Sequence, residues 1–557
     1  MQKVWQKSYD PKTPYEINTN DKSLVDLFDG VCTKYSDKRA VTCHGENLTF
    51  EQVGQLVNNL SESLIKLGVK PGDRVAVIMP NIIQYPITVF SILKIGAVVV
   101  NINPLYTESE MSYILQNSGA QVAFVMDAMA RTLNKIHESG ILKQIIVTSL
   151  ADHYSFFKRH IFNFAIKYIK KINTSYTYKA HSYRDLLNGE CDSQISFPKV
   201  KNTDIAFIQY TGATTGHPKG AILYHSCIVS NLCQIHAWVL SFMDNISDQV
   251  VINALPLYHI FSLTANLFTF FFVGAENVMI PNPRDIKDVV SILNSTPYTV
   301  FSGLDTLYNH LLNDERFRKS DFSKYKYSIA GGMPARQSVA DLWYKVTGVH
   351  FTNCYGLTET SPAVTMNKIG DIFDGSVGYP ISSTEVQIVD VNTHIPLAIG
   401  EHGLIWVRGP QVMGGYWNNP EQTKKALNED GWFNTGDIGY LNEKGQLYIS
   451  SRETELIIVS GFNVYPVEVE LELDLIPQIK ESAVIGRSDE NTGESVNAFV
   501  VLHTKGSITE IDIRKKCKEK LAGYKVPKNV YIVDSLPKTL VGKIDKVNLA
   551  KKYFTNK

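Results

Sequence analysis

Short, continuous apolar runs alternate with helical stretches along the first 210 residues. Two of these runs start at Arg74 and Gln121 and read Arg-Val-Ala-Val-Ile-Met and Gln-Val-Ala-Phe-Val-Met. A third, residues 204–210, ends at a loop rich in glycine and threonine. Such runs are typical of strands that are buried on both faces of a largely parallel sheet covered by helices. We therefore expect an α/β fold.

The length of the chain indicates more than one domain, because 557 residues exceed what a single core usually holds. After about residue 450 the pattern changes to short helices and strands, which predicts a compact α+β unit of about 100 residues. We predict a large N-terminal domain of layered sheets and helices over residues 1–451, a hinge at 452–456, and a small mobile C-terminal domain over 457–557.

Composition excludes several classes of protein. The 55 basic residues balance the 55 acidic ones, so no global charge attracts nucleic acid. The seven cysteines form no CxxC pair, which argues against a disulfide framework and favours a reducing, cytoplasmic location. The N-terminal residues 1–22 lack the apolar core of a signal peptide.

One segment, residues 153–184, has no acidic residue and interleaves basic with aromatic side chains. This pattern suits an anionic lipid surface, so peripheral binding to the inner face of the membrane is one interpretation. An ordinary solvated helix face explains the pattern equally well. Nucleic acid is a weaker third interpretation.

The loop after residue 210 has the chemistry of a phosphate site. Its glycines let the backbone approach phosphate oxygens, its threonines add hydroxyl donors, and its lysine adds positive charge. The spacing differs from a Walker A loop, because the glycines stand one residue closer and no Ser or Thr follows the lysine. The candidate phosphate-binding residues are Thr211, Gly212, Ala213, Thr214, Thr215, Gly216 and Lys219.

This loop resembles the phosphate loop of the adenylate-forming superfamily, which includes acyl-CoA synthetases, peptide-synthetase adenylation domains and luciferases. The resemblance implies the adenylate-forming fold and binding of MgATP. One position departs from the family pattern: Ala213 stands where glycine is usual. A methyl group there limits positive φ and is expected to weaken ATP binding modestly.

Residues 353–360, Asn-Cys-Tyr-Gly-Leu-Thr-Glu-Thr, resemble the second core motif of the superfamily. The resemblance implies that Tyr355 stacks on adenine, Asn353 lies at its edge and Thr358 touches the α-phosphate. It also implies that Glu359 holds Mg²⁺, with Thr211 as a second ligand, because a hard cation prefers oxygen donors. The other wall of the adenine slot is expected at Gly331 and Gly332.

Two further motifs follow in family order. In the motif at residues 430–439, Asp437 resembles the carboxylate that binds the ribose hydroxyls, and Arg452 stands at the spacing of a second ribose contact. In the motif at 537–546, Lys543 resembles the catalytic lysine that stabilises charge on the α-phosphate. Asp545 and Lys546 replace the usual Leu-Arg.

Among the superfamily, the chain is most similar to bacterial long-chain fatty-acid–CoA ligases, through residues 254–261 and 461–466 among others. This resemblance implies activation of a fatty acid to acyl-AMP and transfer of the acyl group to coenzyme A. It places His259 near the carboxylate and Gly461 beside the thiol path. The hinge reads Ser-Arg-Glu-Thr-Glu over 451–455, so Thr454 departs from the usual Lys or Asp.

Two alternatives stay open on the sequence. The first is a fatty acyl-AMP ligase that loads a separate carrier protein. The second is a catalytically weak paralogue that binds nucleotide or lipid, supported by Ala213 and the altered hinge. In each case the chain could act as a homodimer.

Overall fold

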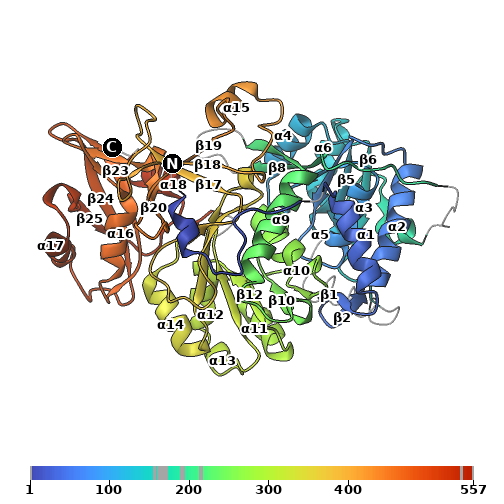
Figure 1. Ribbon diagram of the computed structural model, residues 1–557, viewed down its shortest axis with the longest axis horizontal. Helices are drawn as coiled ribbons and strands as arrows, with labels where there is room; N and C mark the ends of the chain where they lie inside the picture. Colours follow the sequence, from blue (N-terminus) through green and yellow to red (C-terminus); the bar gives the residue numbers. More distant parts are fainter. Residues whose placement is uncertain are drawn as a thin grey trace.

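The computed structural model describes residues 3–19, 21–154, 159, 174–188, 195–211, 218–539 and 543–554. Strands within these ranges form four sheets of seven, nine, four and five strands. In Figure 1 the blue and cyan elements such as α1, α2 and α6 lie at one end of the molecule, while the C-terminal elements α16, α17 and β23 lie at the other. The predicted mixed fold, a large N-terminal domain followed by a small C-terminal one, is confirmed.

The seven-stranded sheet contains all three apolar runs that predicted buried strands. Neighbours in it are parallel except for the last pair, β8 and β9. The β8–β9 turn holds the phosphate loop at the edge of this sheet. The strands, in spatial order, are β7 (His181–Ser182), β6 (Gln144–Thr148), β5 (Val122–Met126), β3 (Arg74–Ile78), β4 (Val98–Asn101), β8 (Ile205–Thr211) and β9 (Lys219–Tyr224).

The nine-stranded sheet is parallel at its centre and antiparallel at both edges. Its strands β10, β13 and β14 carry residues 254–261, Gly331 and Gly332, and the motif at 353–360 at or after their carboxyl ends, where parallel sheets usually bind ligands. In spatial order they are β16 (Tyr379–Pro380), β15 (Ala363–Met366), β14 (Phe351–Gly356), β13 (Tyr327–Ala330), β12 (Val300–Gly303), β10 (Val250–Asn253), β11 (Glu276–Met279), β1 (Arg39–Cys43) and β2 (Glu46–Thr49).

Two smaller sheets complete the molecule. The four-stranded antiparallel sheet comprises β17 (Glu385–Val389), β18 (Gly403–Arg408), β19 (Phe433–Leu441) and β20 (Leu447–Arg452). The C-terminal sheet comprises β22 (Phe462–Val464), β21 (Ile457–Val459), β24 (Gly493–Leu502) and β23 (Ile479–Asp489), with β25 (Asn529–Ile532) beside β24. The predicted C-terminal helices and strands are therefore present, with strands longer than expected.

Helices cover the sheets and connect their strands. In the N-terminal half these are α1 (Leu24–Lys34), α2 (Phe50–Lys66), α3 (Gln84–Lys94), α4 (Glu108–Ser118), α5 (Asp127–Ala130), α6 (Asn134–Glu138), α8 (Tyr183–Leu187), α9 (His225–Val239) and α10 (Thr269–Phe271). Later in the chain are α11 (Ile286–Ser295), α12 (Asp305–Leu312), α13 (Glu315–Arg318), α14 (Gln337–Thr347), α15 (Pro420–Ala426), α16 (Pro466–Asp474), α17 (Glu510–Lys520) and α18 (Lys546–Phe554). Short 3₁₀ turns are η1 (Val4–Ser8), η2 (Arg131–Leu133), η4 (Ile246–Asp248), η6 (Thr358–Thr360), η7 (Glu453–Glu455) and η8 (Gly523–Lys525).

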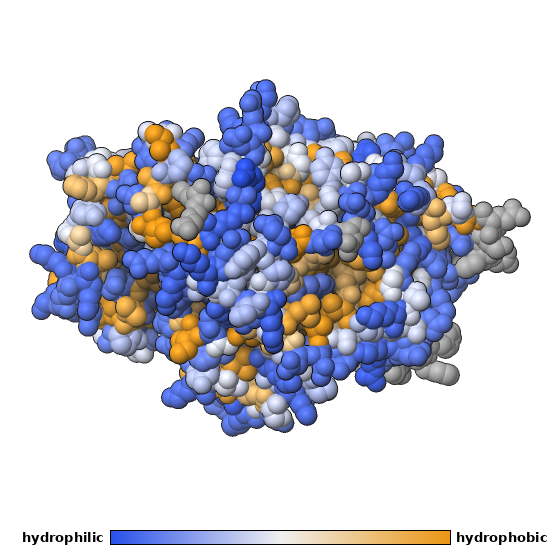
Figure 2. Space-filling model, in the orientation of Figure 1, coloured by the Kyte–Doolittle hydropathy of each residue, from blue (hydrophilic) through white to orange (hydrophobic). Residues whose placement is uncertain are grey.

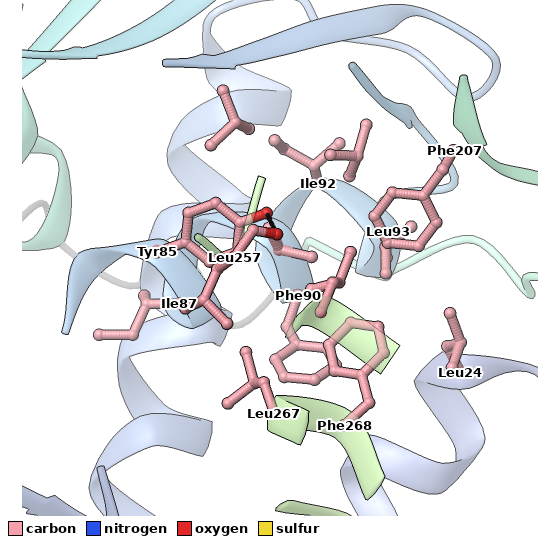
Figure 3. Close-up of a cluster of buried hydrophobic side chains, with 14 of the residues drawn as sticks. Leu24, Tyr85, Ile87, Phe90, Ile92, Leu93, Phe207, Leu257, Leu267 and Phe268 are labelled. Atoms are coloured by element: carbon pink, nitrogen blue, oxygen red, sulfur yellow. Dashed lines mark hydrogen bonds between the residues drawn. The ribbon is translucent and has the colours of Figure 1, made fainter. Parts of the chain in front are cut away.

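An aromatic core joins the seven-stranded sheet to the nine-stranded one (Figure 3). Phe90 of α3 lies with its ring centre 5.3 Å from that of Phe268, which ends the π-helix η5 (Phe261–Phe268). The buried Tyr85 hydroxyl donates to the carbonyl of Leu257 at 2.8 Å (Figure 3). These contacts fix the chain just before residue 259. The phenylalanines of 268–271 are thus core residues, as we expected for most of that run.

The outer surface offers no large apolar face in the view of Figure 2, where hydrophilic residues surround several separate apolar groups. Among the helices of the described residues, none combines the length and the apolar character needed to cross a bilayer. The apolar stretch at 87–102 is α3 running into β4, and that at 263–273 is η5 running into α10.

We expect Gly378→Ala to lower the free energy of unfolding by about 3 kcal/mol or more. Gly378 has φ +93°, and an added Cβ would overlap the peptide between Met366 and Asn367. Its carbonyl also accepts from Leu447 N at 2.8 Å, which ties β20 to the nine-stranded sheet. Denaturant unfolding measures the loss.

Gly370→Ala is the matched control for this substitution. Gly370 has φ +91°, but nothing lies within 4 Å of an added Cβ. We expect only the cost of the left-handed backbone, about 1–2 kcal/mol. Equal losses in the two variants would contradict the steric argument.

Candidate active site

The phosphate loop is the connection of an antiparallel strand pair. β8 ends at Thr211, β9 begins at Lys219, and these two residues are direct partners. The Thr211 hydroxyl donates to the carbonyl of Lys219 at 3.4 Å, so both ends of the loop are held together. The predicted phosphate-binding residues between them lie outside the described residues and stay a prediction: Gly212, Ala213, Thr214, Thr215 and Gly216.

Lys219 and Glu359 both contact Tyr416, a residue that the sequence analysis did not identify. The Lys219 ammonium lies 5.1 Å from the centre of the Tyr416 ring and donates to Gln422 Oε1 at 2.8 Å. The Tyr416 hydroxyl donates to Glu359 Oε1 at 2.8 Å. Burial, followed by the neighbouring Glu359, raises the pKa of Tyr416, so the phenol remains a neutral donor. The Tyr416 ring therefore lies between a lysine, which attracts anions, and a carboxylate, which attracts cations.

Glu359 and Thr211 have the donor chemistry for Mg²⁺. Glu359 lies in η6 with 9% exposure, and its main-chain carbonyl accepts from Met413 N at 2.8 Å. The Thr211 hydroxyl donates its proton to the backbone, which leaves its oxygen lone pairs as acceptors. Carboxylate and hydroxyl oxygens suit a hard cation bound between protein and phosphates. Thr358, the predicted α-phosphate contact, precedes Glu359 in the same turn.

Asp437 is the centre of a charged cluster formed by two sheets. It pairs in register with Arg452 across β19 and β20, and Arg452 Nε lies 2.7 Å from Asp437 Oδ1. From β14 of the nine-stranded sheet, the Tyr355 hydroxyl donates to Asp437 Oδ2 at 2.6 Å. Burial raises the pKa of Asp437, while Arg452 and Tyr355 act to lower it. The arrangement brings together three residues that we predicted around the nucleoside.

The predicted adenine wall follows β13. Gly332 has φ +75°, and a Cβ on Gly331 would lie 2.7 Å from Cys354 Sγ and 3.1 Å from the ring of Phe261. Only glycine therefore lets this segment pass between β14 and η5. Asn353 on β14 is 3% exposed, and its side-chain nitrogen donates to the Ser376 carbonyl at 2.9 Å.

The charge of Lys543 acts on His259. Burial and then the positive charge of Lys543 lower the pKa of His259 to about 4, so the ring is neutral at pH 7. Loss of hydration and then Arg452 lower the pKa of Lys543, while Asp437 acts in the opposite direction. The charge of a C-terminal-domain residue therefore interacts with two residues that we predicted around the nucleoside.

Gly461, which we predicted beside the thiol path, lies in a turn of the C-terminal sheet. It follows Ser460 in the turn between β21 and β22, with φ +83°, and nothing lies within 4 Å of an added Cβ. The turn is exposed on the C-terminal domain. Thr454, the altered hinge position, lies in the exposed turn η7 directly after β20.

Comparison with known proteins identifies the family. The profile of the AMP-binding enzyme family matches residues 28–417, and that of the AMP-binding enzyme C-terminal domain matches residues 468–543. The chain belongs to the AMP-binding enzymes. Curated relatives of this AMP-binding enzyme include long-chain-fatty-acid–CoA ligases of Yersinia pestis, 43% identical, and Bacillus subtilis, 35% identical. Each alignment covers 98% of this chain and 97% of the relative.

Solved structures agree with this assignment of the AMP-binding enzyme. ATP-bound MatB from Rhodopseudomonas palustris has a TM-score of 0.82 at 28% identity, covering 95% of this chain and 99% of that one. The anthranilate CoA ligase AuaEII in complex with anthranoyl-AMP has a TM-score of 0.85 at 25% identity, covering 96% and 99%. The predicted resemblance to the adenylate-forming superfamily is confirmed.

Proposed function

We propose that this AMP-binding enzyme is an ATP-dependent long-chain-fatty-acid–CoA ligase. It joins a fatty acid to coenzyme A through an acyl-adenylate and releases pyrophosphate and AMP. The observation that carries the proposal is the cluster around Asp437, which Tyr355 and Arg452 contact at 2.6 and 2.7 Å and on which the charge of Lys543 acts. The two relatives described above, which bear this activity in their names, align over nearly the whole chain.

In the first half-reaction the fatty acid carboxylate attacks the α-phosphate of ATP, and pyrophosphate leaves. Lys219 attracts the β- and γ-phosphates, and Asp437 accepts hydrogen bonds from the ribose hydroxyls. Lys543 stabilises the negative charge that develops on the α-phosphate. Mg²⁺ held by Glu359 and Thr211 would neutralise charge on the departing pyrophosphate. Neutral His259 adds no positive charge that would trap the carboxylate.

In the second half-reaction the thiolate of coenzyme A attacks the mixed anhydride, and AMP leaves. We propose that the C-terminal domain turns about residues 452–456 between the two steps, which removes Lys543 and brings Gly461 to the site. The exposed position of Gly461 supports this, because an added Cβ there would meet nothing within 4 Å. Hinges of this kind need only a few residues to absorb the rotation.

The experiment that tests the function is an assay of purified protein with MgATP and fatty acids of several lengths, with and without coenzyme A. We expect acyl-CoA, AMP and pyrophosphate, formed fastest from long-chain acids. Pyrophosphate without acyl-CoA would instead indicate a ligase that loads a carrier protein. No ATP turnover with any acid would overturn the proposal and favour the nucleotide- or lipid-binding paralogue.

We expect Phe261→Ala to change the selectivity for the acid. Phe261 begins η5 two residues after His259, and its ring lies against Gly331 and Gly332. Removing the ring opens space beside the acyl-adenylate, so kcat/KM for α-branched long-chain acids should rise about 10-fold relative to unbranched ones. The KM for ATP should stay within about 2-fold.

Phe242→Ala is the matched control, since Phe242 is a half-buried phenylalanine that packs near the end of α9. It should leave the ratio of branched to unbranched activity unchanged. Parallel changes for both classes of acid in Phe261→Ala would show that the ring does not line the acyl pocket.

We further propose that the enzyme is cytoplasmic and binds the inner face of the membrane peripherally. The support is the basic and aromatic composition of residues 153–184, most of which lie outside the described residues. Co-sedimentation with anionic vesicles at low salt, lost at high salt, is expected. Protein that stays in the supernatant at low salt would end this proposal. Light scattering on the same preparation tests the homodimer.

A further inference from the structure

Arg336 links the two domains directly. It precedes α14, shortly after the adenine wall, and its Nη1 donates to the carbonyl of Lys480 in β23 of the C-terminal domain at 2.8 Å. On the other side the guanidinium is fixed by Asp305, with Nε and Nη2 at 2.8 and 2.7 Å from Asp305 Oδ2. The Arg336 main-chain N–H donates to Asp305 Oδ1 at 3.0 Å. The side chain is thus held rigidly in one orientation.

Asp305 lies beside the predicted adenine wall. It is 3% exposed and begins α12, directly after Leu304, whose methyl group lies 3.1 Å from the Cβ position of Gly332. Its carboxylate binds Arg336 rather than capping the helix. The Asp305–Arg336 pair therefore fastens the loops after β12 and β13 to each other.

A short path leads from Lys480 to Lys543. The next residue, Glu481, binds the Lys538 ammonium, with Oε1 and Nζ 2.7 Å apart. Lys538 and Ile544 form an isolated antiparallel β-bridge through their backbones, and the Thr539 N–H donates a hydrogen bond to the carbonyl of Lys543 at 2.7 Å. β23, which Arg336 contacts, is therefore linked through Lys538 and Thr539 to Lys543.

The C-terminal domain offers the guanidinium a carboxyl group as well as a carbonyl. Asp474 at the end of α16 accepts from Ser482 Oγ at 2.8 Å, and its charge interacts with Arg336. A second contact between the domains lies elsewhere, where the rings of Tyr465 and His402 stack with centres 4.9 Å apart. Of these two contacts between the domains, the Arg336 contact is the one that leads through Lys480 and Glu481 to Lys543.

We propose that Arg336, oriented by Asp305, is a positioning residue for acyl-adenylate formation: it seats the C-terminal domain so that Lys543 enters the cleft. This inference rests on the proposed role of Lys543 and deepens it. It predicts that loss of the contact affects the two half-reactions unequally, because the thioester step takes place after Lys543 has left.

The test compares Arg336→Gln with Arg408→Gln. Arg408 also binds a carboxylate through a guanidinium nitrogen, at 3.1 Å from both Glu385 oxygens, but within the four-stranded sheet. Three quantities are measured: acid-dependent ATP–pyrophosphate exchange, transfer from pre-formed acyl-AMP to coenzyme A, and cleavage after Glu453 by endoproteinase Glu-C. Arg336→Lys, which keeps the charge beside Asp305 without the planar fork, is measured alongside them.

For Arg336→Gln we expect exchange to fall about 10-fold or more, because small displacements of a catalytic group cost this much. Transfer from acyl-AMP should stay within about 2-fold of wild type, cleavage after Glu453 should accelerate, and Arg336→Lys should be intermediate. Arg408→Gln should match wild type throughout. Equal losses in both half-reactions, or unchanged exchange and cleavage, would overturn the proposal. Cleavage by the protease needs no enzyme turnover, so it tests the domain contact even if the wild-type protein shows no exchange. Absence of exchange in the wild-type protein would count against the proposed function and not against the domain contact.

Discussion

Replacing Lys543 with methionine should lower the rate of acyl-adenylate formation by about 10²–10³-fold, the usual effect of removing one preorganised charge from a transition state. The expected loss of rate follows from the charges that surround Lys543. The Lys543 ammonium lies close enough to Arg452, Asp437 and His259 for their charges to shift one another's pKa. Methionine keeps the length and loses the charge. Acid-dependent ATP–pyrophosphate exchange measures the step.

The same variant should transfer the acyl group from pre-formed acyl-AMP to coenzyme A at nearly the wild-type rate, because that step does not use Lys543. Lys505→Met is the control, since Lys505 lies on the surface of the same domain and pairs with Asp534 at 2.7 Å. It should leave both half-reactions unchanged. Equal loss of exchange and transfer in Lys543→Met would mean that the lysine acts in both steps or merely supports the fold.

Asp437→Asn should raise the KM for ATP about 10²-fold, since two hydrogen bonds to a charged acceptor together contribute about 3 kcal/mol. The carboxylate is almost fully buried and already oriented by Arg452 and Tyr355. An amide has the same shape, but it offers one acceptor oxygen and no charge. Steady-state kinetics with ATP and fatty acid varied separately measures the effect, and the KM for the acid should change little.

Asp430→Asn is the control for this substitution. It lies in the same sequence motif but on an exposed turn before β19. Its kinetic constants should equal those of the wild type. If Asp437→Asn lowered kcat while the KM for ATP stayed constant, Asp437 would be acting on the reacting phosphate rather than on the ribose.

The sequence predicted those parts of the fold and the site that depend on short contiguous segments. Apolar runs such as that at residues 74–79 predicted buried strands because both faces of a central strand must be apolar. Asp437 and Arg452 were identified by their resemblance to the superfamily motifs, and the structure places them opposite each other in one antiparallel strand pair. Asp437 lies within β19.

Residues that join distant segments could not be found in this way. Tyr416 bridges Lys219 and Glu359, and Gln422 binds the same lysine, yet no pattern in the sequence marks either contact. The role of Arg336 likewise depends on a partner carbonyl 144 residues away. Such contacts are set by how sheets pack on one another, which periodicity within one segment does not encode.

Arg452 belongs both to the charged cluster around Asp437 and to the predicted hinge. It is the last residue of β20, in contact with Asp437, and the residue from which the predicted hinge departs. We therefore expect a ligand that engages Asp437 and a rotation at the predicted hinge to be coupled, each altering the equilibrium of the other by the same factor. Nucleotide binding at Asp437 should then bias the orientation of the C-terminal domain, and release of each product should remove that bias.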